Sequence, residues 1–70
     1  MKLRNITTNR ELQKMMRVAV KEGWVLEKRN GGHIKWIRPD GFFYFSSQTP
    51  SDVRALHKIR SALRKAGLKL

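Results

Sequence analysis

The residue of this chain with the most direct chemical capability is His33, in the run Asn30-Gly31-Gly32-His33-Ile34-Lys35-Trp36. The ordinary pKa of imidazole is near neutral, so this side chain can act as a general base or general acid. In a strand, Lys35 lies on the same face as His33, where its ammonium group can stabilise negative charge. Gly31 and Gly32 would let a polymer backbone approach closely. A simple hairpin turn followed by an exposed strand histidine is the other interpretation.

The charge of the chain indicates the class of its binding partner. Its 70 residues contain 16 Lys and Arg and 5 Asp and Glu, a formal net charge of +11. The basic residues are spread along the chain and 40% of the residues are apolar, which favours a folded basic domain over a disordered arm. A polyanion such as a nucleic acid is therefore the expected partner. A structural protein that only neutralises phosphates would have the same charge.

RNA offers a reaction that suits an imidazole. A base that removes the 2′-hydroxyl proton lets this oxygen attack the adjacent phosphorus, and no metal is required. Two histidines and five scattered carboxylates have no metal-ligand spacing, so we expect no metal and no cofactor. Lys28 or Arg29, on the neighbouring strand, could assist His33, depending on the register.

The length of the chain permits one domain, residues 1–70, with residues 1–8 expected to be flexible or loosely ordered. A domain of this size buries only about 60% of its unfolded surface, so aromatic residues must supply much of the core. The chain has no cysteine, which is compatible with a reducing cytoplasm. There is no apolar run of the roughly 18 residues that a membrane span needs, and no signal-peptide pattern. We therefore expect a soluble cytoplasmic protein without a membrane partner.

A first helix is predicted over residues 9–22. Thr8 and Glu11 have the spacing of a capping box, and Gly23 follows as a C-terminal cap. The apolar stripe expected to face the core comprises Leu12, Met15, Met16, Ala19 and Val20.

Three strands are predicted over residues 24–29, 33–38 and 42–46, because short aromatic and β-branched runs are separated by turn sequences. In the middle strand, alternation directs Ile34 and Trp36 toward the helices and His33 and Lys35 toward solvent or a ligand. The run 42–45 is apolar on both faces, so we expect an aromatic patch covered by RNA or a protein, with the direction of Tyr44 left open.

A second helix is predicted from Pro50 to Ala66, with Thr49 as its cap and Gly67 after its end. Its apolar arc contains Leu56, Ile59, Ala62, Leu63 and Ala66. The opposite arc is basic, and its residues are either phosphate contacts or a solvated face: Arg54, His57, Lys58, Arg64 and Lys65. The expected fold is α+β, ordered α-β-β-β-α, with both helices on one face of a three-stranded antiparallel sheet.

These features together resemble one family. The string Glu22-Gly23-Trp24-Val25-Leu26, the run 29–36, the turn Pro39-Asp40-Gly41 and the segment 59–68 resemble the HicA-type mRNA interferase toxins, in the same order and with similar spacings. The resemblance covers about residues 11–68. It implies a fold like that of double-stranded-RNA-binding domains, an endoribonuclease activity on mRNA, His33 as the catalytic histidine, and a HicB-type antitoxin as partner.

Two positions differ from the family pattern. Gly32 stands where the family usually has Ser or Thr, and Ser47-Gln48-Thr49-Pro50 stands where many members have a Pro-x-His element. The alternative is therefore a non-catalytic relative that binds RNA or DNA through its sheet and basic helix.

Overall fold

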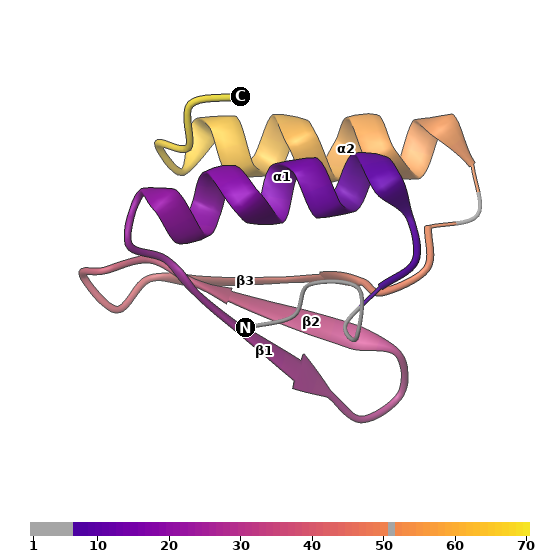
Figure 1. Cartoon of the computed structure of the whole chain (residues 1–70), viewed down its shortest axis with the longest axis horizontal. Helices are drawn as coiled ribbons and strands as arrows, with labels where there is room; N and C mark the ends of the chain where they lie inside the picture. The colour runs from indigo at the N-terminus through magenta and orange to yellow at the C-terminus, as the bar shows by residue number, and fades with distance from the viewer. Residues whose placement is uncertain (1–6, 51) are drawn as a thin grey trace.

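The chain forms a helix, three strands and a second helix in sequence order (Figure 1). A computed structural model describes residues 7–50 and 52–70. The elements are α1 (Arg10–Lys21), β1 (Val25–Arg29), β2 (His33–Ile37), β3 (Phe43–Ser47) and α2 (Val53–Lys65). The strands form one antiparallel sheet in the order β1-β2-β3, and both helices lie on the same side of it (Figure 1). The predicted class and element order are confirmed.

The two faces of the sheet differ because successive side chains of a strand point to opposite sides. In β2, Ile34 and Trp36 are fully buried beneath the helices, whereas His33 is exposed on the other face. The predicted inward direction of Trp36 is confirmed. Its indole nitrogen donates a hydrogen bond of 2.8 Å to the Ser46 hydroxyl, which satisfies the one polar atom of a buried aromatic residue.

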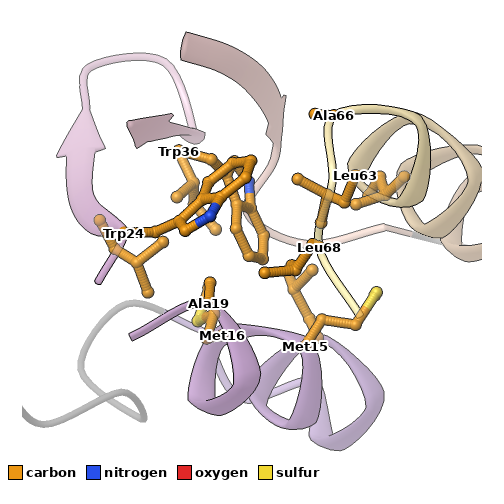
Figure 2. Close-up of a cluster of buried hydrophobic side chains, with 12 residues drawn as sticks. Met15, Met16, Ala19, Trp24, Trp36, Leu63, Ala66 and Leu68 are labelled. Atoms are coloured by element: carbon orange, nitrogen blue, oxygen red, sulfur yellow. The ribbon is translucent and has the colours of Figure 1, made fainter. Parts of the chain in front are cut away.

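The core lies between the helices and the sheet, and Figure 2 shows Trp24 and Trp36 among side chains of both helices. The buried apolar residues are Leu12, Met15, Met16, Ala19, Trp24, Leu26, Ile34, Trp36, Ile59, Leu63, Ala66 and Leu68. Val20 was predicted to be buried but is 44% exposed. Eight residues after Leu12, it lies about 80° around the helix from Leu12 and therefore at the margin of the stripe.

The first helix is capped by a different residue from the one predicted. The Asn9 side chain accepts a hydrogen bond of 3.0 Å from the Leu12 amide, whereas Glu11 pairs with Lys14. Asn is as good a cap as Thr, so the helix begins one residue later than the Thr8 box requires. Thr7, expected to be loosely ordered, is buried and donates to the Gln48 carbonyl at 2.6 Å. Residues 1–6, the greater part of that predicted segment, lie outside the described residues.

The second helix starts at Val53, not at Pro50 as predicted. The Asp52 carboxylate accepts a hydrogen bond of 2.9 Å from the Ala55 amide and is the N-cap. Thr49 instead donates its amide to the Ser47 hydroxyl at 3.2 Å, so it belongs to the turn that follows β3. This local hydrogen bond competes with helix formation at Thr49, and the helix is capped by Asp52 instead.

Arg38 connects the hairpin between β2 and β3 to the end of α2. Its guanidinium donates to the Ala66 carbonyl at 2.8 Å and to both carboxylate oxygens of Asp40 at 2.8 and 2.7 Å. The Ala66 carbonyl is among those left without an intrahelical partner at a helix C-terminus. The hydrogen bonds from Arg38 lower the pKa of Asp40 to about 2.

Candidate active site on the open face of the sheet

The face of the sheet that the helices leave uncovered is called here the open face. Paired residues form three rows across it, each running from β1 through β2 to β3. The rows are Arg29–His33–Ser47, Glu27–Lys35–Phe45 and Val25–Ile37–Phe43. The candidate catalytic histidine therefore lies on the central strand, in the row nearest the β1–β2 turn.

His33 is exposed at the first position of β2, directly after two glycines. Gly31 and Gly32 have φ values of +82° and +77°, which lie in the left-handed region that other residues rarely adopt. A Cβ atom at Gly31 would lie 3.4 Å from the His33 Nδ1 atom, whereas one at Gly32 would meet nothing within 4 Å. The turn thus brings bare main chain against one edge of the imidazole.

The register decides between the two basic residues proposed to assist His33. Arg29 pairs directly with His33 and lies on the open face, whereas Lys28 pairs with Ile34 and belongs to the helix side. The Arg29 guanidinium is 3.3 Å from the carboxylate of Glu27. Sequence reasoning did not single out Glu27, because only the register shows that this carboxylate shares a face with His33.

The ammonium group of Lys35 lies among aromatic rings instead of beside His33. Its Nζ atom is 4.5 Å from the centroid of the Phe43 ring and 6.0 Å from that of Phe45. Phe43 belongs to the row beyond Lys35, so the side chain leans away from His33. In this conformation Lys35 shares the face of His33 as predicted, but not its immediate surroundings.

The aromatic run of the third strand is divided between surfaces. Phe43 and Phe45 are 50% and 48% exposed on the open face. Tyr44 points to the helix side and packs against the core, which settles its direction. Phe42 precedes β3, is 45% exposed, and has the Arg38 guanidinium 4.6 Å from its ring centroid. The predicted patch of four aromatic residues is therefore a pair on the open face.

The basic residues of α2 form a second surface, separate from His33. The five predicted side chains are all exposed: Arg54, His57, Lys58, Arg64 and Lys65. Because α2 packs on the helix side of the sheet, these residues do not meet the open face (Figure 1). A shallow hollow of about 590 Å³ on this helix is lined by His57, Arg60, Ser61, Arg64 and Lys65. Arg60, which the sequence prediction omitted, also lies 3.5 Å from Glu11.

Within the described part of the chain, no three His, Asp or Glu side chains gather in a way that could hold a metal ion. No helix of residues 7–50 and 52–70 is long and apolar enough to cross a membrane. Comparisons with protein-family models, curated proteins and solved structures found no match to this chain. The similarity to HicA-type toxins therefore stays a prediction from the sequence.

Proposed function

We propose that this chain is a HicA-like, metal-independent endoribonuclease that cleaves mRNA with His33 as general acid or base. The observation that carries the proposal is the position of His33. Its imidazole is exposed on the uncovered face of the sheet, opposite Arg29 and Ser47, and beside a glycine turn that a polynucleotide backbone can approach.

The reaction is an internal phosphoryl transfer. As the 2′-hydroxyl loses its proton to a base, its oxygen bonds to phosphorus, and the bond from phosphorus to the 5′-oxygen breaks when that oxygen gains a proton. An imidazole can perform either proton transfer. Arg29 lies across from His33, where its guanidinium can stabilise the negative charge that develops on the phosphoryl oxygens. Ser47, which pairs with His33 from β3, has a hydroxyl group. Gly32, the residue before His33, has none.

The proposed protein partner is an acidic antitoxin of the HicB type. A domain with a net charge of +11 attracts an acidic protein electrostatically. Because His33 is exposed on a sheet face, a protein that covers that face is enough to exclude RNA. We expect the complex to lose RNA cleavage and to protect residues 31–35 from hydrogen exchange. An antitoxin that binds while cleavage continues at the full rate would contradict masking of the site.

The direct test is RNA cleavage by the purified protein in the presence of a chelator. We expect His33→Ala to lower the rate by about 10²- to 10⁴-fold with little change in fold or RNA affinity, because loss of a general acid or base has that effect. His57→Ala, at the other histidine of the chain, is the matched control and should cleave a short RNA, which does not reach α2, at the normal rate. Undiminished cleavage by His33→Ala, or a requirement for divalent cations, would reject the proposal.

A second candidate is a non-catalytic RNA- or DNA-binding module. It is favoured by the contacts that both cations of the open face already make, since Arg29 pairs with Glu27 and Lys35 lies against Phe43. This module would bind RNA without cleaving it under any condition that preserves the fold. Competition between RNA and DNA of the same sequence would then identify its ligand.

A further inference from the structure

We propose that Phe43 and Phe45 form a base-stacking platform, so that the RNA presented to His33 is single-stranded. The inference rests on the proposed function for the location of the scissile phosphate. Stacking itself can be measured without cleavage.

The first support is the exposure of two neighbouring aromatic rings on an otherwise small domain. Phe43 and Phe45 are each about half exposed. In a domain this small, burying either ring would add to a thin hydrophobic core, so their exposure has a cost in stability. Their ring centroids are 5.5 Å apart with planes at 74°. Two bases that stack on rings so inclined cannot be parallel to each other. Successive bases of a duplex are parallel and covered, so only unpaired nucleotides fit.

The second support is the charge beside the rings. The Lys35 Nζ atom lies over the Phe43 ring, 4.5 Å from its centroid, and 6.0 Å from the centroid of the Phe45 ring. A base that stacks on this face of Phe43 displaces the ammonium group, whose flexible side chain can then reach the phosphate of the same nucleotide. In the three rows of paired residues on the open face, the two cations Arg29 and Lys35 outnumber the one carboxylate, Glu27. Aromatic rings interleaved with cations are the usual composition of surfaces that bind single strands, because the rings hold the bases and the cations hold the backbone.

The third support is the distance to the histidine. Phe45 lies in the row next to that of His33, and Phe43 lies one row further. Neighbouring rows on one face are separated by two residues, or about 6.6 Å. A base stacked on Phe45 therefore places its own sugar and phosphate within reach of the imidazole. Phe43 then receives the next base along the strand.

The experiment uses the wild-type protein with an oligonucleotide of about five 2′-O-methyl nucleotides, in the size range of single-strand sites. The 2′-O-methyl group prevents cleavage, so equilibrium affinity can be measured. An abasic oligonucleotide of equal length and charge is the reference. We expect the oligonucleotide with bases to bind about 5- to 150-fold more tightly for each stacked base. A duplex of the same sequence should gain nothing from the rings.

The variants separate stacking from simple apolar contact. Phe45→Leu and Phe43→Leu keep an apolar side chain but should each lower the affinity for the base-containing oligonucleotide by about 5-fold or more. Phe45→Tyr should retain the affinity, since the ring remains. Val53→Ala, at an exposed apolar residue of α2, should have no effect. Circular dichroism and thermal melting verify that each variant is folded.

Equal affinity for the base-containing and abasic oligonucleotides, or wild-type affinity of the folded Leu variants, would overturn the platform even if His33 cleaves RNA. Leu variants that bind RNA normally but lose a protein partner would also overturn it, because the patch would then be a protein interface. A stacking effect in a protein that cleaves no RNA would support the platform and reject only the nuclease.

Discussion

At the residue scale, the candidate catalytic imidazole borders the glycine two positions before it, Gly31. Gly31→Ala adds a methyl group 3.4 Å from the His33 Nδ1 atom, whereas Gly32→Ala adds one in open space at nearly the same φ. Both variants should lose about 1–2 kcal/mol of stability, because a left-handed backbone disfavours a Cβ atom. We expect only Gly31→Ala to lower the cleavage rate beyond this common effect, by shielding one ring nitrogen.

Thermal melts and single-turnover cleavage measure the two effects of these glycine variants separately. Equal rates for the two variants would mean that the methyl group does not interfere with His33, and that the Nδ1 edge faces away from the substrate.

The sequence was sufficient to predict that His33 is exposed, because Ile34 and Trp36 require the other face of the same strand. It was not sufficient to choose Arg29 over Lys28. That choice depends on the register of β1 against β2. If the turn shifts the register by one residue, every side chain of the strand moves to the opposite face of the sheet. Glu27 was missed for the same reason. The position of the Lys35 ammonium depends on rotamers and on the rings of β3, which no spacing rule supplies.

At the scale of the elements, the start of α2 depends on one carboxylate. Asp52→Ala removes the acceptor of the Ala55 amide and should cost about 0.5–2 kcal/mol in the free energy of unfolding. Thr49→Ala, at the cap expected from the sequence, should cost much less. Urea denaturation of both variants compares the two positions directly. A larger loss in the free energy of unfolding for Thr49→Ala than for Asp52→Ala would show that Thr49 is the N-cap.

The turn between β2 and β3 should respond to acid. Hydrogen bonds from Arg38 and from the Phe42 amide lower the pKa of Asp40 from 3.8 to about 2. Its contribution to stability is therefore complete above about pH 4 and is lost as the pH falls through about 2. In Arg38→Ala, the pKa of Asp40 should return toward 3.8. Carboxyl NMR titration measures this value. An unchanged pKa would show that the Phe42 amide, the second cause of the shift, is sufficient alone.

Both helices were predicted from periodicity, and the glycines expected after their ends, Gly23 and Gly67, have positive φ values, but both N-terminal caps were wrong. Several Thr, Asn, Ser and Asp residues precede each helix, and each can accept from a backbone amide. The choice among them depends on tertiary contacts such as the Thr7 hydrogen bond to Gln48, which joins residues 41 positions apart. Local sequence therefore identifies the existence of these helices better than their first residues.

At the scale of the whole molecule, the two basic surfaces lie on different sides of the fold. The affinity for a short oligonucleotide bound on the open face should therefore not change when Arg54, Lys58 and Lys65 are all replaced by Gln. A long RNA that wraps to α2 should bind the variant more weakly, with a salt slope reduced by about 0.7 for each lost phosphate contact. Affinity measured against salt for both lengths tests this. Equal losses for both lengths would place the short RNA on α2, and no loss for either would make this helix face merely solvated.

The separation of the surfaces could not be predicted from charge. The sequence shows basic residues in every third of the chain, and only the packing of α2 on the helix side directs Arg54, His57, Lys58, Arg64 and Lys65 away from His33.

The placement of His33 on the middle strand also limits how another protein can silence it. β1 and β3 are the edges of the sheet, so each can accept an added strand from a partner through main-chain hydrogen bonds. Such an added strand would lengthen the sheet sideways and leave a full strand between itself and the imidazole. An inhibitor that works by edge pairing alone would thus leave His33 uncovered, and an effective one must lie across the strands.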